Sequence, residues 1–237
     1  STSPAGSPNE SWGNWGPARP EMGMHASAGS ASETNSTDDT SNSAKGLKAG
    51  ASLVVRGGTY EIDSSDDSLH CNSTLDIYDG AFTLSSGDDG MHADDALTIH
   101  GGTIRIGKSY EGIEGLSVTV TGGDIEVTAS DDGINSAGGS DTGMPAGRPG
   151  QNGFRSAQSS DSYIKITGGK VTASSKNAGA GIGGGDEGNG EDITITGGEV
   201  KASSENVGAG IGGGYKGDGK RIKITDGTVD AASDKGA

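Results

Sequence analysis

The fold is decided by two consecutive stretches, Leu75-Asp-Ile-Tyr-Asp-Gly-Ala-Phe-Thr-Leu84 and Leu97-Thr-Ile-His-Gly-Gly-Thr-Ile-Arg-Ile106. Each stretch alternates apolar and polar residues on both sides of a glycine, which indicates two short strands with one buried face, joined at a turn. The same pattern recurs over 53–62, 117–127, 164–173, 193–202 and 222–231. The chain is therefore predicted to be a solenoid, because one such unit cannot bury its apolar face alone and must stack on the next.

The length of one unit follows from its turn glycines. The spacings are 22, 22 and 21 residues for Gly58, Gly80, Gly102 and Gly123, and 29 residues for Gly169, Gly198 and Gly227. A third apolar stretch precedes each strand pair and contains Leu47, Leu69, Met91, Ile113 and Ile134. Three strands in about 22 residues form one rung of a parallel β-helix. Chain chirality favours a right-handed coil, so we predict an all-β, right-handed parallel β-helix with three strands per rung.

Composition supports one solenoid with extruded loops. The chain has 237 residues, of which 46 are glycine and only 4% are aromatic, and this would suggest disorder if the glycines were not regularly spaced. Residues 1–42 lack an apolar period and are predicted to be a loop or linker rich in Gly, Ser and Pro. The β-helix is predicted over 43–237, with an insertion loop at 138–161. Its apolar pairs, including Ile222 and Ile224 of the last rung, are expected to lie inside the coil.

The formal net charge of −16 limits the possible partners. It disfavours nucleic acid and anionic membranes, and no apolar run is long enough to span a membrane. One cysteine permits no disulfide within the chain. The first residue is Ser, so we expect that a signal peptide was removed or that the chain is an excised piece. The composition favours a protein that is secreted or on the surface of a bacterium, either a monomer or part of a larger surface protein.

Acidic residues recur at the corner before each first strand. The main acidic positions, one per rung, are Asp67, Asp89, Glu111 and Asp132, and the positions before them are Asp66, Asp88, Tyr110 and Asp131. The positions three residues after the main ones are His70, His92, Glu114 and Asn135. Stacked strands lie about 4.8 Å apart. Two carboxylates at that distance repel by about 3.5 kcal/mol at an effective dielectric of 20, so the stacked acids need cations.

Calcium suits this arrangement because it takes six to eight oxygen ligands in flexible geometry. The predicted Ca²⁺ ligands are Asp66, Asp67, Asp88, Asp89, Glu111, Glu114, Asp131 and Asp132. Two alternatives stay open at this point. Each Asp-Asp-Gly can be a plain turn signal, and the two histidines raise the option of a transition metal. The glycine-rich runs 179–185 and 208–214 lack the acids and are predicted to be structural.

Five residues beside the acids are predicted to contact carbohydrate: Lys45, Lys48, His70, His92 and Tyr110. The two histidines are expected to point outward beside the acidic column, either as surface residues or as ligand contacts. Lys45 and Lys48 belong to a degenerate first rung that has cations where later rungs have acids. They are either solvated charges or the base of a polysaccharide lyase. No residue is assigned as catalytic.

Five motifs in a fixed order closely resemble a known family: Ser-Ala-Lys-Gly-Leu-Lys-Ala-Gly (43–50), Ser-Ser-Asp-Asp-Ser-Leu-His (64–70), Ser-Ser-Gly-Asp-Asp-Gly-Met-His-Ala-Asp (85–94), Lys-Ser-Tyr-Glu-Gly-Ile-Glu-Gly (108–115) and Ala-Ser-Asp-Asp-Gly-Ile-Asn (129–135). This is the secreted carbohydrate-binding β-helix family of cellulolytic clostridia, whose fold is similar to that of pectate lyases. The resemblance covers about residues 43–139, and the chain resembles a C-terminal portion of a member of this family. It implies Ca²⁺ as cofactor and affinity for plant cell-wall polysaccharides such as polygalacturonate and cellulose, without an established catalytic activity.

Three functions compete on these grounds. The first is non-catalytic, Ca²⁺-dependent binding of a plant cell-wall polysaccharide, either an acidic one such as polygalacturonate or cellulose. The second is a pectate-lyase-like enzyme that uses Lys45 or Lys48 as its base. The third is a structural stalk or adhesin that Ca²⁺ only stiffens.

Overall fold

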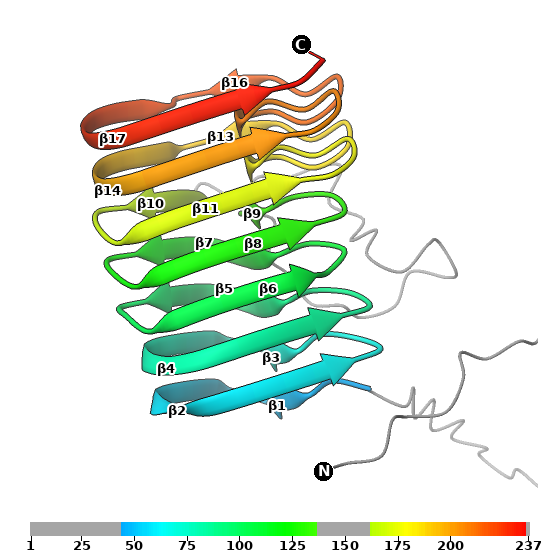
Figure 1. Cartoon of the computed structure of the whole chain (residues 1–237), viewed down its shortest axis with the longest axis vertical. Helices are drawn as coiled ribbons and strands as arrows, with labels where there is room; N and C mark the ends of the chain where they lie inside the picture. The colour runs from blue at the N-terminus through cyan, green and yellow to red at the C-terminus, as the bar shows by residue number, and fades with distance from the viewer. Residues whose placement is uncertain (1–43, 137–161, 236–237) are drawn as a thin grey trace, which may run out of the picture. The chain divides into compact units, whose positions relative to one another are not determined.

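The computed structural model describes residues 44–136 and 162–235, and all of their regular elements are strands. The predicted loop or linker 1–42 and the predicted insertion loop 138–161 lie outside the described residues. The strands stack in a coil that rises from β1 and β2 to β16 and β17 (Figure 1). Every strand pairing among the described residues is parallel. In the described part of the chain, no helix of the length and apolarity needed to cross a membrane occurs.

Each turn of the coil contributes strand segments to three columns. Column 1 contains β1 (Leu47–Ala49), β3 (Leu69–Cys71), β9 (Ile134–Asn135), β12 (Ile182–Gly183), β15 (Ile211–Gly212) and the first residues of β5 (Met91–Ile99) and β7 (Ile113–Val120). Column 2 contains the ends of β5 and β7, together with β10 (Tyr163–Ile166). Column 3 contains β6 (Thr103–Lys108), β8 (Asp124–Ala129) and β11 (Lys170–Ser175). Four strands run through columns 2 and 3: β2 (Ser52–Ser64), β4 (Thr74–Ser86), β14 (Ile193–Ser204) and β17 (Lys223–Ser233).

The rungs are in register as the spacing of 22 residues predicts. In column 1, Leu69 pairs with Met91, Met91 with Ile113, and Ile113 with Ile134. The rungs of 29 residues contain one addition, the short pair β13 (Gly190–Glu191) and β16 (Gly219–Lys220). The prediction of parallel β strands stacked in a three-column repeat is therefore confirmed.

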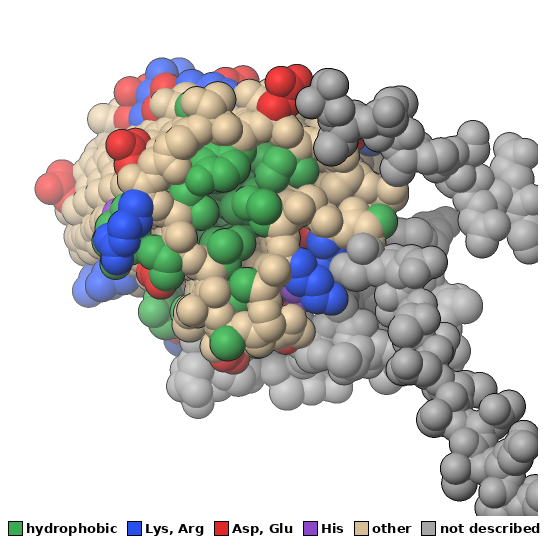
Figure 2. Space-filling view, turned by 90° about the horizontal axis from the view of Figure 1, so that it is seen from below, with side chains coloured by type: hydrophobic (Ala, Val, Ile, Leu, Met, Phe, Trp, Pro, Cys, Tyr) green, Lys and Arg blue, Asp and Glu red, His purple; other side chains and the backbone are tan. Residues whose placement is uncertain are grey.

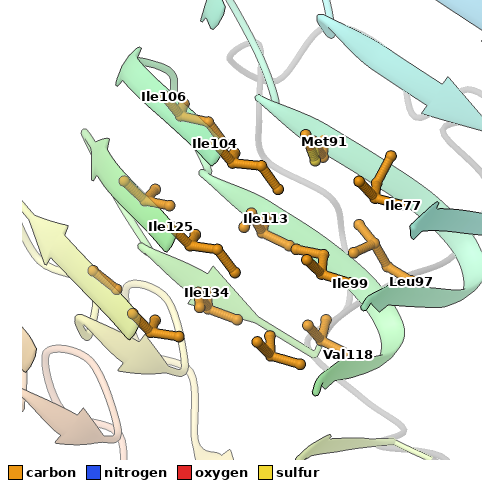
Figure 3. Close-up of a cluster of buried hydrophobic side chains, with 14 of the residues drawn as sticks. Ile77, Met91, Leu97, Ile99, Ile104, Ile106, Ile113, Val118, Ile125 and Ile134 are labelled. Atoms are coloured by element: carbon orange, nitrogen blue, oxygen red, sulfur yellow. The ribbon is translucent and has the colours of Figure 1, made fainter. Parts of the chain in front are cut away.

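The inward side chains of the three columns form one continuous core along the coil. Figure 3 shows this core from column to column, with Met91 and Ile113 stacked in column 1, Ile99 in column 2, and Ile104 and Ile125 in column 3. All five are fully buried. Isoleucine, leucine and valine supply most of these positions, because branched side chains pack well on a pleated surface. Burying one such side chain stabilises the fold by about 1.5–3 kcal/mol.

The two ends of the coil are less covered than its middle. Figure 2, which views the N-terminal end, shows hydrophobic side chains gathered at its centre. Leu53 and Ile62 of that first rung are only partly buried. At the other end, Ile222 and Ile224 are 38% and 49% exposed. The expectation that these two isoleucines are buried is wrong, because β17 pairs only with β14 and no described rung stacks on its outer side.

Columns 2 and 3 meet at a corner made by the turn glycines, which we call the glycine corner. At Gly102 the backbone has φ of +95°, a conformation that residues with a side chain rarely adopt. A Cβ atom there would lie 2.8 Å from the carbonyl oxygen of Gly80 in the rung below. The close stacking of successive rungs therefore requires glycine at this position.

Replacing Gly102 by alanine should lower the free energy of unfolding by about 2 kcal/mol, because the left-handed backbone and the contact with Gly80 both become unfavourable. The matched control is Gly107→Ala in the same rung, where an added Cβ meets no atom within 4 Å. It should change the stability by less than about 0.5 kcal/mol. Chemical denaturation of the three proteins measures both effects. Equal stability of the Gly102 and Gly107 variants would contradict this account of the corner.

Candidate metal centre

Column 1 begins at a second corner, where stacking brings the predicted acids together. We call this the acidic corner, and its members are Asp66, Asp67, Asp88, Asp89, Glu111, Glu114, Asp131 and Asp132. Its backbone is regular, since Ser68 N donates to the carbonyl of Asp89 and Gly90 N donates to that of Glu111. The predicted stacking of His70, His92, Glu114 and Asn135 is confirmed by their pairing. The corner divides into three groups of potential ligands, each with its ligand atoms within 4.8 Å of one another.

The lowest group, Asp66, Asp67 and Asp88, already contains a cation from the protein. Lys45 Nζ lies 3.1 Å from Asp66 Oδ1 and also contacts Asp67. His70 Nδ1 lies 2.7 Å from Asp67 Oδ2. Burial opposes the charge on Lys45, but the two aspartates outweigh it and raise the pKa of this lysine. Burial likewise opposes the charge on Asp67, yet His70 and Lys45 lower its pKa.

The middle group, Asp89, His92 and Glu114, is compensated by its own imidazole. His92 Nδ1 lies 2.9 Å from Asp89 Oδ2 and 3.0 Å from Glu114 Oε2, and His92 Nε2 lies 3.1 Å from Asp94 Oδ1. A carboxylate only accepts hydrogen bonds, so both ring nitrogens must donate and the ring is an imidazolium. Burial opposes this charge, but bonds to Asp89 and Glu114 raise the pKa of His92 to about 12. A charged imidazole has no lone pair for a metal, so His92 serves this group as its cation.

The burial of the two histidines corrects one expectation. His70 and His92 were expected to point outward, but they are 2% and 0% exposed, and their rings stack with centroids 5.0 Å apart. The rings face the carboxylates of the corner because buried carboxylates require hydrogen-bond donors, and the imidazoles supply them. His92 therefore has no surface with which to contact a polysaccharide.

The third group, Glu111, Asp131 and Asp132, has no such cation. All three residues are buried, and no described Lys, Arg or His forms an ion pair with them. Asp132 Oδ1 accepts a hydrogen bond of 3.0 Å from Ala180 N. Asp132 Oδ2 is buried without a hydrogen-bond partner. Burial first, and then repulsion by neighbouring carboxylates, raises the pKa of Glu111 and of Asp132.

The third group therefore fits a bound cation better than either of the others. Three buried carboxyl groups repel one another when ionised, and a divalent ion would remove this repulsion. A metal could fill the place beside Asp132 Oδ2, but Asp89 Oδ1 of the middle group is also buried without a hydrogen-bond partner among the described residues, so the lack of a described protein cation is what sets the third group apart. The donors are all oxygens, which favours Ca²⁺ over the softer transition metals.

A loop that the sequence marked as structural closes this group from above. Gly179 and Gly185 of the glycine-rich run lie against the carboxylates of Asp131 and Asp132. A Cβ on Gly179 would lie 2.3 Å from Asp132 Oδ1, so only glycine lets this loop approach. The next residue after the run, Asp186, donates its backbone N–H to Asp131 Oδ2 at 3.4 Å. Gly179, Gly185 and Asp186 were not predicted as site residues, and their only signal in the sequence is their place in the rung that follows Asp132.

The remaining predicted residues lie at the edge of the corner. Tyr110 is partly buried and donates its hydroxyl to Asp131 Oδ2 at 3.5 Å. Burial and the neighbouring carboxylates, of which Asp131 contributes most, raise the pKa of Tyr110. Lys48 is exposed and pairs in register with His70. Asp66 and Asp88 are partly exposed, in contrast to the buried acids of the inner column.

Two parts of the chain match known family models. Residues 21–90 match a family model described as carbohydrate-binding domain-containing protein, and this segment includes the lower part of the acidic corner. Residues 21–90 are therefore similar to a carbohydrate-binding domain family. Residues 164–186 and 193–215 match a model of the β-helix repeat. No curated protein and no solved structure matches the chain. The third acidic group lies in the sequence between these two matched regions.

If the third group binds Ca²⁺, Asp132→Asn should act in opposite directions with and without the ion. In chelator the variant should be more stable than the wild type, because one of three repelling charges is gone. The wild type should gain about 2.7 kcal/mol at a Ca²⁺ concentration 100 times its Kd, whereas the variant should gain little. Thermal unfolding with Ca²⁺ and with chelator measures both effects. Glu205→Gln, at an exposed ion pair with Lys176, is the control and should keep the full response. A full Ca²⁺ response in the Asp132 variant would exclude this group as the site.

The metal-free protein should lose stability as the pH rises. Within the acidic corner, the carboxyl groups with raised pKa are Asp89, Glu111, Asp131 and Asp132, and those with lowered pKa are Asp67 and Glu114. Above about pH 4 a group with raised pKa holds its proton longer in the folded state, so the free energy of unfolding falls with pH. The two lowered groups act below about pH 4, where their contribution is lost. The thermal midpoint in chelator should be lower at about pH 8 than at about pH 5, and saturating Ca²⁺ should reduce this difference. An identical pH profile with and without Ca²⁺ would argue against the coupling.

Proposed function

We propose that the protein is a non-catalytic module that binds an acidic plant cell-wall polysaccharide such as polygalacturonate in a Ca²⁺-dependent manner. The observation that carries this proposal is the third acidic group, whose carboxylates are buried and which, within the described part of the chain, has an unpartnered oxygen at Asp132 and no basic side chain paired with it. The carbohydrate-binding family of residues 21–90 supports the class of ligand. We further propose that the coil is right-handed, and that the protein is secreted or displayed on a bacterial surface.

A bound cation would reduce the repulsion between this acidic protein and an acidic polysaccharide. A chain with net charge −16 repels a polyuronate unless local charge is cancelled. Glu111 and Asp132 are buried, so an ion between them neutralises the corner without touching sugar. The partly exposed rim of Asp66, Asp88 and Tyr110 is where uronate groups would approach, with exposed Lys48 beside it. An ion in the third group would lower the negative potential near this rim, so that uronate carboxylates could approach it.

The lyase alternative is weakened by the surroundings of Lys45. A lyase base must be unprotonated to take a proton from carbon. Lys45 contacts Asp66 and Asp67, and these aspartates raise its pKa despite burial, which keeps it protonated. Lys48 is exposed in β1 and is the remaining lysine of the first rung. We therefore favour the binding function over the lyase function.

The stalk alternative keeps one observation in its favour, the burial of the third group. An ion among Glu111, Asp131 and Asp132 would tie the rung that begins at β7 to the rung that begins at β9, and the loop of Gly179 would close over it. Such an ion stiffens the coil whether or not sugar binds. The two functions differ in one measurable property, which is retention on polysaccharide.

The binding proposal predicts that polygalacturonate retains the wild type when Ca²⁺ is present and releases it in chelator. The double variant Asp131→Asn/Asp132→Asn should lose most of its retention, since the ion that offsets the negative charge is gone. The matched control Glu205→Gln should behave as the wild type. A pull-down of the three proteins with and without chelator provides the test, and added salt should weaken retention. Retention that survives chelator would refute the Ca²⁺ mechanism, and no retention under either condition would favour the stalk.

A further inference from the structure

Three side chains form a stack at the surface of the glycine corner. This corner lies between columns 2 and 3, whereas the acidic corner lies before column 1. Arg56, Tyr78 and His100 end the column 2 segments of three successive rungs. The rings of Tyr78 and His100 are stacked, with centroids 4.4 Å apart and planes at 14°. The guanidinium carbon of Arg56 lies over one face of the Tyr78 ring, 4.4 Å from its centroid. All three side chains are exposed.

Each member of this stack restrains the next. Asp76 Oδ1 lies 3.7 Å from His100 Nε2, at one end of the stack. His100 supports the ring of Tyr78, and Tyr78 supports the guanidinium of Arg56. A guanidinium lying on an aromatic ring keeps its in-plane N–H groups free to donate, and the ring limits its rotamers. Arg56 is therefore an oriented donor at the surface.

Arg56 differs from the other arginines that the structure describes. Arg105 Nη2 lies 2.8 Å from Asp124 Oδ2, and Arg221 Nη2 lies 2.7 Å from Glu191 Oε2. Arg56 has no carboxylate partner among residues 44–136 and 162–235. In a chain with 33 acidic and 17 basic residues, an arginine without an acidic partner is available to a carboxylate from outside.

The stack is confined to one patch. In the next two rungs the same column contains Thr121 and Thr167, whose hydroxyls donate to backbone carbonyls at 3.4 Å. Beside Arg56 on the same face of β2 lies Val54, which is 45% exposed. A guanidinium fork next to an exposed apolar side chain fits a sugar that carries a carboxylate on one side and C–H groups on its ring.

We propose that Arg56, oriented by the stack with Tyr78 and His100, binds the carboxylate of an acidic sugar residue, with Val54 against the sugar ring. The class of ligand rests on the proposed function, but the contact needs no metal and uses none of the residues of the acidic corner. It would give the module a second point of attachment to a polyuronate chain.

The test compares variants for affinity to polygalacturonate in the presence of Ca²⁺. Arg56→Ala should weaken binding about tenfold, because a charge-assisted, two-pronged hydrogen bond is lost. Arg56→Lys should lose most of the same affinity, since lysine keeps the charge but has neither the planar fork nor the stacking. The control Arg105→Ala changes the net charge equally and should leave affinity within about twofold. All three should keep the wild-type melting shift with Ca²⁺. Equal affinity of Arg56→Ala and Arg105→Ala would overturn the proposal.

A second measurement separates this proposal from the metal-dependent function. In metal-free protein, the Nε–Hε resonance of Arg56 should shift on titration with galacturonate and stay unchanged with galactose. A shift that acetate reproduces at the same concentration would indicate a carboxylate contact without sugar recognition and would overturn the proposal, as would no shift. If galacturonate shifts the resonance while polygalacturonate fails to retain the protein, the Arg56 contact stands and the Ca²⁺ mechanism falls. If retention depends on Ca²⁺ but Arg56→Ala has no effect, the Ca²⁺ mechanism stands and the Arg56 contact is refuted.

Discussion

The in-register stacking of one rung on the next is the constraint on which every other feature depends. Parallel hydrogen bonds hold equivalent residues of neighbouring rungs about 4.8 Å apart. Whatever occupies one position of the repeat therefore meets its own equivalent above and below. For Met91 and Ile113 this creates a continuous core, and for Gly80 and Gly102 it allows two backbones to meet at the glycine corner. The same constraint forces acids to stack on acids.

The acidic corner shows how the chain answers that repulsion in different ways. At its lower end Lys45 supplies a positive charge to Asp66 and Asp67. In the middle His92 is enclosed by carboxylates and carries the charge itself. Above them no lysine, arginine or histidine of residues 44–136 and 162–235 supplies one, and burial raises the pKa of Glu111 and Asp132. The three solutions in succession explain why one group is the strongest candidate for an external ion although all three are acidic.

Stacking also accounts for both proposed routes to an acidic polysaccharide. At the acidic corner, carboxylates in column need a cation, and a cation provides attraction for uronates. At the glycine corner, the same spacing stacks Tyr78 on His100 and places Arg56 on Tyr78. A polymer that carries a carboxylate on every residue suits a protein with contacts on two corners, since linked contacts reinforce one another when the chain can reach both.

The fold could be predicted from the sequence because alternation and spacing depend on local residue types. The recurrence of Leu75/Ile77 and Leu97/Ile99 at 22 residues fixed the inward faces, and the register then followed by counting. The same counting placed Asp67, Asp89, Glu111 and Asp132 in one column. The sequence could not show which acids are already paired, because pairing depends on side-chain direction and burial. Only the tertiary structure turned His92 inward between two carboxylates and brought the loop of Gly179 onto Asp132, 47 residues away along the chain. Spacing along the chain determined the columns. Side-chain packing in three dimensions decided which acidic group has no basic partner among the described residues.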